Sequence, residues 1–484
     1  MSQSLRPDAR TAAPETTSAL TAEGYQKSLS RRHIQMIAMG GAIGVGLFLG
    51  AGGLLATTGP ALLLSYALAG VIAYFLMRAL GELVMYRTTS GSFVSYAGEM
   101  FGAKGAYLSG WMYALNWIMT GIAELIAIGL YFQFFFPNVP LEVAAIAALL
   151  LLVSINLFSA KAFGETEFWA SLLKVSAIVI FLVVGTVLVV MNARIGEHTA
   201  TVSNLFASDG GLFPNGVMVS ILVLNSVIFA YNGIEMVGIT AGEAKDPERE
   251  VPQAIRAVVL RIVVFYVGSV TLLAMLLPHD AYSAGESPFV TVFSQIGASW
   301  IGDAMNIVVI TAALSSCNSG LYSMGRVFRA MAHNGHAPVW LARMNSRHVP
   351  YAAILTVGVL YFFGILLNIW LGGTYAFELA LNSASIGVLC TWGAIFASQL
   401  GLRRKEGRVS TLPMPGSPWT SWIGLGALLL IGVLVSFDTR VDPATGDVFR
   451  LGLYTIACVP LFAVALWLGW LRVRHHEPAN EFYS

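Results

Sequence analysis

Twelve apolar runs, each long enough to cross a bilayer as a helix, recur from one end of this chain to the other. A membrane-spanning helix needs about 20 consecutive apolar residues. Of the 484 residues, 56% are hydrophobic and only 11% are charged, whereas soluble domains carry about 25% charged residues. We therefore predict an all-α polytopic membrane protein with 12 transmembrane helices. The runs lie near residues 34–56, 61–84, 106–135, 141–159, 167–191, 217–241, 257–277, 300–328, 350–370, 375–399, 419–437 and 451–471.

The positions of Lys and Arg predict how these helices are oriented. Twelve crossings place both termini on one side, and most of the Lys and Arg residues in loops then fall on that side. Only Arg194, Arg440 and Arg450 fall on the other side. Because cytoplasmic loops carry an excess of Lys and Arg, we predict that both termini are cytoplasmic. The predicted organisation is a polar tail over 1–32 that does not resemble a signal peptide, a transmembrane domain over 33–472 and a second tail over 473–484.

Composition and motifs exclude several classes of function. The net charge of +1 gives no basis for nucleic-acid binding. There is no phosphate-binding Gly-x-x-x-x-Gly-Lys loop and no Ser–His–Asp set within the apolar runs. Cys317, Cys390 and Cys458 lie in apolar runs and form neither a disulfide framework nor a spaced metal site. We therefore expect no enzymatic activity, no cofactor and no metal, and we expect transport to be driven by a gradient.

Two of the runs contain residues that interrupt a helix. The first run holds glycines at positions 40, 41, 44, 46 and 50, and the sixth holds Asn232, Gly233 and Glu235. Unpaired backbone groups are tolerated inside a membrane only where they face a protein cavity or a bound solute. Transporters built from inverted repeats carry such interruptions at matching positions of their two halves. We therefore predict repeats over 33–191 and 217–399 and two further helices over 419–471, with close helix packing as the alternative explanation of the glycines.

Few ionisable residues lie inside the predicted helices, and each is a functional candidate because a charge within the membrane is costly. Glu124 shares one helical face with Asn116 and Thr120, and we expect this face to point inward. Glu235 lies in the second interruption, where it either takes part in function or holds the broken backbone. Lys174 lies about two turns into the fifth helix, and it is either a buried functional amine or a lysine that snorkels to the interface.

Other polar groups within the runs have mainly structural interpretations. Arg78 and Glu82 are four residues apart on the second helix and are predicted to form an intrahelical ion pair. Asn382 belongs to a small polar patch on the tenth helix that either lines a pocket or joins helices. The eighth helix carries a cluster that either joins helices or coordinates a sodium ion: Thr311, Ser315, Ser316, Asn318 and Ser319.

Several motifs, spread from about residue 29 to residue 474, resemble those of the bacterial amino acid transporter family of the amino acid–polyamine–organocation superfamily. They are the stretches 35–48 (QMIAMGGAIGVGLF), 78–83 (RALGEL), 90–97 (SGSFVSYA), 163–169 (FGETEFW) and 242–252 (GEAKDPEREVP). Within the family, the stretches 285–291 (GESPFVT), 305–309 (MNIVV) and 348–351 (HVPY) are most similar to those of asparagine permeases. Permeases for serine, alanine and glycine are the next most similar.

The resemblance implies a LeuT-like fold with a 5+5 inverted repeat, two additional helices and discontinuous helices TM1 and TM6. It implies that backbone N–H groups around Gly44, Val45 and Gly46 hold the α-carboxylate of an amino acid. The α-ammonium group would be held by the carbonyls of Ala42, Ile43, Phe229, Ala230 and Asn232. Selectivity would come from the side chains of Glu124, Tyr113, Asn116, Tyr231, Asn232 and Asn382.

The resemblance also implies proton coupling, because Lys174 matches a lysine that takes the place of sodium in proton-coupled relatives. The sequence departs from the family pattern at two positions. Val45 stands where many members have Thr or Ser, and Glu124 stands where Asp is expected in the most similar permeases.

We therefore predict a symporter of the bacterial inner membrane that imports a small polar L-amino acid, asparagine by preference, together with a proton. Lys174 and Glu235 are the predicted proton-coupling residues. A permease for serine, alanine, glycine or their D-forms, or for another neutral amino acid, is the alternative. An amino acid sensor with a transporter-like fold is the alternative from another class.

Overall fold

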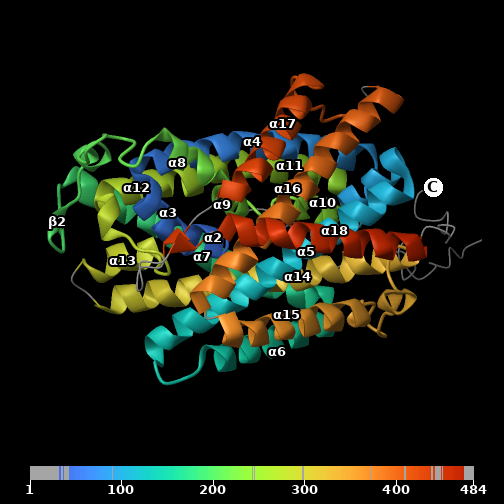
Figure 1. The fold of residues 1–484 in the computed structure, drawn as a ribbon, viewed down its shortest axis with the longest axis horizontal. Helices are drawn as coiled ribbons and strands as arrows, with labels where there is room; N and C mark the ends of the chain where they lie inside the picture. Colours follow the sequence, from blue (N-terminus) through green and yellow to red (C-terminus); the bar gives the residue numbers. More distant parts are fainter. Residues whose placement is uncertain are drawn as a thin grey trace, which may run out of the picture.

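The computed structural model describes residues 32–33, 36, 43–89, 91–242, 244, 246–296, 299–371, 373–407, 410–437, 440–441, 448–449 and 451–473. Long helices run side by side through most of this part of the chain (Figure 1). Within it, ten helical stretches are long and apolar enough to cross a membrane, and a shorter apolar one covers Val217–Ala230. The prediction of an all-α polytopic membrane protein is thus confirmed.

The helices follow one another with short connections. They are α2 (Val45–Phe48), α3 (Gly50–Thr58), α4 (Leu62–Tyr86), α5 (Ser92–Phe135), α6 (Leu141–Phe158), α7 (Ala160–Val190), α8 (Val217–Leu222), α9 (Leu224–Ala230), α10 (Met236–Ala241), α11 (Pro247–Arg261), α12 (Ser269–Leu276), α13 (Pro288–Ser294), α14 (Ser299–His333), α15 (Tyr351–Leu371), α16 (Gly373–Glu406), α17 (Trp419–Leu434) and α18 (Leu451–Val473). The 3-10 turns are η1 (Gly59–Ala61), η2 (Val202–Leu205), η4 (His279–Ala281), η5 (Val339–Ala342) and η6 (Val435–Phe437), and η3 (Ile262–Gly268) is a π-helix.

Two small antiparallel hairpins lie between helices. Strand β1 (Arg194–Ile195) pairs with β2 (His198–Thr199), with Arg194 opposite Thr199. Strand β3 (Arg440–Val441) pairs with β4 (Val448–Phe449). Each hairpin precedes or follows a long apolar helix, and none of these strands belongs to a larger sheet among the described residues.

Among the described residues, the predicted runs over 34–56 and 217–241 consist of short helices. The described part of the first contains α2 and α3, and the second contains α8, α9 and α10. Helix α3 ends at Gly59, whose φ of 72° lies in the left-handed region. A Cβ atom at Gly59 would lie 2.3 Å from Cγ of Pro214, so only glycine allows the chain to reverse here into η1 and α4.

Helix α5 lies at the centre of the bundle and packs against α14, α16 and α6. It is 44 residues long and is kinked at Gly102, which has a φ of 71°. Its large side chains Tyr113 and Trp117 are fully buried between the neighbouring helices. Helix α18 lies along the outside of α5 and α16 and remains mostly exposed (Figure 1).

The intrahelical ion pair predicted for Arg78 and Glu82 is wrong. Glu82 is fully buried and accepts hydrogen bonds from Nε and Nη2 of Arg403 on α16, at 2.8 and 2.9 Å. Arg78 instead donates to the backbone carbonyl of Pro413 at 2.6 Å. Both side chains on α4 therefore hold segments that are more than 300 residues away in the sequence.

Candidate substrate-binding site

The first interruption is the described part of the predicted break, residues 43–46, where α2 begins. Gly44 is the N-cap residue of α2, with an extended backbone (φ −127°, ψ −158°), and Ile43 precedes it outside any helix. The first N–H groups of a helix have no acceptor within that helix, so the N–H groups of Val45 and Gly46 need acceptors from outside α2. Ile43 and Val45 are fully buried. Ala42, which was predicted to contribute a carbonyl, lies outside the described residues.

The second interruption lies between α9 and α10. Helix α9 ends at Ala230, α10 begins at Met236, and Gly233 between them has a left-handed φ of 91°. The N–H of Gly233 donates to Oε2 of Glu235 at 3.1 Å. Glu235 is fully buried, and the Trp392 side chain is a further hydrogen-bond donor to its carboxylate. Glu235 thus holds the backbone of the second interruption.

The two interruptions are in direct contact. Helix α2 packs against α9, and a Cβ atom at Gly46 would lie 2.8 Å from Cα of Ala230 and 3.1 Å from Cδ1 of Phe229. A side chain at position 46 would therefore collide with the backbone of α9. Gly46 is therefore required by the close approach of the two backbones. Ordinary packing between helices would not demand a glycine at this position.

Three amide and hydroxyl side chains form a closed ring beside the second interruption. Asn116 Nδ2 donates to Asn232 Oδ1 at 2.9 Å, and Asn232 Nδ2 donates to Thr120 Oγ1 at 3.1 Å. Thr120 Oγ1 in turn donates to Asn116 Oδ1 at 3.1 Å. All three residues are buried. The polar face of α5 that the sequence predicts therefore points inward, toward the broken helix.

Glu124, one turn further along α5, reaches the first interruption. A Cβ atom at Gly44 would lie 2.6 Å from Glu124 Oε1 and 3.1 Å from Ser316 Oγ. The Ser316 hydroxyl and the Val45 backbone N–H are hydrogen-bond donors to this carboxylate, and its Oε2 has no partner. The positive end of a helix dipole favours such a negative group. Glu124 therefore occupies the position predicted for the substrate α-carboxylate.

Lys174 on α7 is bound to the other side of the first interruption. Its ammonium group donates to the carbonyl of Ile43 at 3.0 Å and to Oγ of Ser315 at 2.8 Å. Its side chain is fully buried, which excludes the snorkelling alternative. The polar cluster on α14 is thus in part a partner of Lys174.

Glu167 is a buried carboxylate next to Lys174 that the sequence analysis did not select. Its Oε1 lies 3.9 Å from Lys174 Nζ and accepts hydrogen bonds from Ser315 at 2.6 Å and from Ser171 at 3.2 Å. Glu167 is seven residues before Lys174, so both lie on one face of α7, about two turns apart. A carboxylate seven residues before a lysine in one apolar helix is the sequence feature that predicts an ion pair between Glu167 and Lys174.

Three other predicted site residues take different positions. Tyr231 donates from its hydroxyl to the carbonyl of Tyr66 at 2.8 Å and stacks on Tyr266 at 4.5 Å, so it points toward α4 and η3. Asn382 accepts a hydrogen bond from Asn225 on α9 at 2.7 Å. Tyr113 is fully buried against Phe93 and Trp117 on its own helix. None of these contacts reaches the ring of Asn116, Thr120 and Asn232.

Arg261 is another buried cation that is not among the predicted site residues. It is the last residue of α11, directly before the π-helix η3, and only 1% of its surface is exposed. Its guanidinium lies 5.9 Å from the ring of Tyr266, and its charge acts on Glu235. π-helical segments are frequent at functional sites. An arginine within the apolar run over 257–277 is the sequence feature that indicates this residue.

The chain matches the protein-family model described as "Amino acid permease" over residues 33–481. The chain belongs to the amino acid permease family. It is therefore a multi-pass membrane transporter of amino acids and not an enzyme.

Several curated proteins of this amino acid permease family are similar to nearly the full length of the chain. The L-asparagine permease of Salmonella typhimurium is 49% identical over 458 residues, which cover 93% of this chain and 90% of that protein. The L-asparagine permease of Streptomyces coelicolor is 45% identical and covers 97% of this chain and 96% of its own length. The L-asparagine permease 2 of Mycobacterium tuberculosis is 47% identical with the same coverage.

Proposed function

We propose that this permease imports L-asparagine together with a proton across the bacterial inner membrane. The chain would cross the membrane twelve times, in two inverted repeats over 33–191 and 217–399 followed by helices over 419–471. The tails 1–32 and 473–484 would both be cytoplasmic. The observation that carries the proposal is the contact of two interrupted helices beside a ring of amide side chains.

The interrupted backbones would recognise the groups that all amino acids share. The N–H groups of Gly44, Val45 and Gly46 at the start of α2 suit an α-carboxylate. The carbonyls of Phe229 and Ala230 belong to the end of α9, which approaches Gly46 closely; the Phe229 carbonyl also accepts from the N–H of Asn232 at 2.9 Å. Those carbonyls, with the ones of Ala42, Ile43 and Asn232, suit an α-ammonium group.

The ring of Asn116, Thr120 and Asn232 would recognise the carboxamide of asparagine. A carboxamide needs both donors and acceptors, and the two Asn side chains supply both. When the substrate amide opens the ring, each bond that is broken can be replaced by one to the substrate. A substrate without this amide leaves buried polar groups unpaired, which such sites reject strongly.

Glu124 would link substrate binding to protonation. Its carboxylate lies beside Gly44 and Val45, where the substrate carboxylate is proposed to bind. Two carboxylates cannot share one small buried space while both are ionised. Substrate binding therefore requires that Glu124 takes up a proton or swings away from α2.

Lys174 would couple the first interruption to the proton. Its ammonium group binds the carbonyl of Ile43, so its protonation state acts directly on the backbone that precedes α2. Ser315 connects Lys174 to Glu167 by two short hydrogen bonds. Glu167 would balance the charge of Lys174 and receive its proton, and Glu235 would stabilise the second interruption.

The test is uptake of labelled L-asparagine into proteoliposomes that contain the purified protein. We expect accumulation when the outside is acidic, in the absence of sodium, and competition by unlabelled asparagine. Uptake that needs a sodium gradient and ignores the pH gradient would refute proton symport. If serine, alanine, glycine or D-amino acids compete and asparagine does not, the substrate assignment is wrong. Failure of counterflow with every amino acid would favour a sensor.

A further inference from the structure

A groove runs between α5 and α18 on the outside of the bundle, and α15 and α16 also line its wider part. It consists of a cavity of 280 Å³ near Lys104 and a cavity of 590 Å³ further along the two helices. Ala463 and Leu466 line both cavities, so the two adjoin each other along α18. This groove is separate from the residues of the candidate substrate site, which lie on the inner face of α5.

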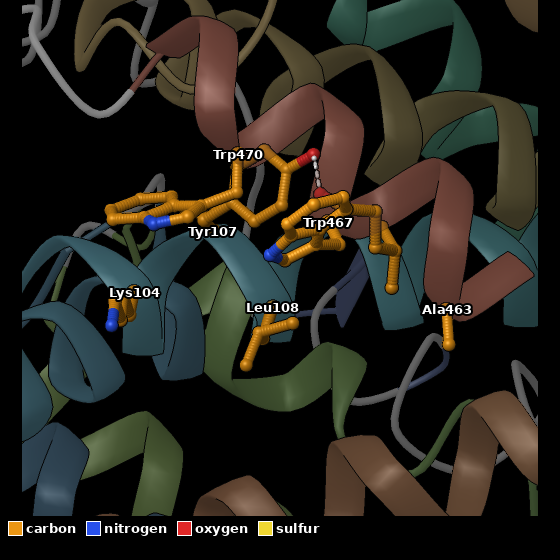
Figure 2. A pocket seen from close by; sticks show the side chains of 7 residues that line it. Lys104, Tyr107, Leu108, Ala463, Trp467 and Trp470 are labelled. Atoms are coloured by element: carbon orange, nitrogen blue, oxygen red, sulfur yellow. Dashed lines mark hydrogen bonds between the residues drawn. The ribbon is translucent and has the colours of Figure 1, made fainter.

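One end of the groove is cationic and aromatic. Figure 2 shows Lys104 and Trp470 together at this end and Ala463 at the other. The ammonium group of Lys104 lies 6.0 Å from the ring centre of Trp470, and Lys104 forms no ion pair with a described carboxylate. Tyr107 donates to the backbone carbonyl of Leu466 at 3.0 Å and ties α18 to α5. Lys, Trp and Tyr are typical of the level of lipid headgroups.

The rest of the groove is apolar and has the length of a lipid chain. Along α5 it extends from Lys104 to at least Met119, which is about 22 Å at 1.5 Å per residue. One leaflet of the hydrocarbon core is about 15 Å thick, half of the whole. An acyl chain whose phosphate lies at Lys104 therefore stays within the groove over its full length.

We propose that this groove binds one anionic phospholipid, with its phosphate at Lys104 and an acyl chain between α5 and α18. Helix α18 is mostly exposed and makes few contacts with the bundle, so the lipid chain supplies packing that the protein itself lacks. The negative headgroup supplies the counter-charge for Lys104. A second copy of the chain fits less well, because a two-fold contact through the same groove brings two Lys104 side chains toward each other.

Native mass spectrometry of the delipidated protein tests the proposal. Phosphatidylglycerol and phosphatidylethanolamine are added separately to the wild type and to the variants Lys104→Gln, Lys104→Arg and Lys161→Gln. Lys161 is an exposed cation near the start of α7, outside the groove, and serves as the matched control. We expect one tightly retained phosphatidylglycerol, whose retention falls about fivefold in Lys104→Gln, the factor for one Lys beside an anionic lipid. Lys104→Arg and Lys161→Gln should retain it as the wild type does.

A second variant, Ala463→Phe, places a ring at the junction of the two cavities. It should lower retention of phosphatidylglycerol while uptake of amino acids continues. Equal retention of both lipids by the wild type, or an unchanged retention in Lys104→Gln, would overturn the proposal. So would a protein dimer that resists delipidation and is lost in Ala463→Phe, because the groove would then be an interface between two copies.

Discussion

Removal of the Glu167 carboxylate is expected to destabilise the protein, because the ammonium group of Lys174 then loses the stronger of its two counter-charges and keeps only Glu124. Both side chains are fully buried, and their charged atoms lie 3.9 Å apart. Removing one partner of a buried ion pair costs about 3–5 kcal/mol. Glu167→Gln keeps the size of the side chain and can still accept a hydrogen bond from Ser315, so the loss of stability reports the removal of the charge. Thermal unfolding in one detergent, followed by fluorescence, measures this loss of stability.

The reverse change, Lys174→Met, should cost a similar amount, because it leaves the carboxylate of Glu167 buried and alone. The double variant should lose less free energy of unfolding than the sum of the losses in the two single variants. The reason is that a buried pair can often be replaced by neutral groups at little cost. Residues in contact typically show interaction energies of about 0.5–3 kcal/mol in such a cycle. Uptake driven by a pH gradient should be lost in all three variants, while asparagine binding persists in the double variant.

Glu165→Gln is the matched control. This carboxylate is two residues before Glu167 on the same helix, is partly exposed, and pairs with the exposed Arg32 and with His33. Ion pairs in contact with solvent contribute little, so this substitution should lower the unfolding temperature much less than Glu167→Gln does. The reasoning is refuted if Glu167→Gln unfolds at the temperature of Glu165→Gln, or if the two single losses simply add in the double variant.

Three other substitutions test the site and its frame. Gly46→Ala should abolish asparagine uptake, because the added Cβ would lie 2.8 Å from Cα of Ala230. The control Gly50→Ala should transport normally, because a Cβ at position 50 meets no atom closer than 3.8 Å. Uptake of labelled asparagine at equal surface expression compares the two variants. Asn116→Ala should raise the apparent KM for asparagine about tenfold or more through the unpaired amide of the ring, with a smaller effect on alanine in the same competition assay. Glu82→Gln should lower the unfolding temperature without changing the KM, because it breaks a buried ion pair outside the site; a changed KM would contradict that assignment.

The sequence alone was sufficient to predict the class of protein. Apolar runs of bilayer length and the low content of charge are properties of the chain itself, because each helix must meet the lipid separately. The glycines before α2 and the residues Asn232 and Gly233 mark local backbone conformations, which depend on neighbouring residues. The inward face of Asn116, Thr120 and Glu124 follows from helical spacing in the same way.

Only the tertiary structure decided which side chain meets which. Periodicity along one helix identifies a face but carries no information about the helix opposite that face. For this reason Glu82, paired by spacing with Arg78, is found with Arg403, and Lys174 is found with Ser315 and the carbonyl of Ile43. The same holds for the glycines: the sequence predicts an interrupted helix at Gly46, and the approach of α9 explains why no larger residue fits there.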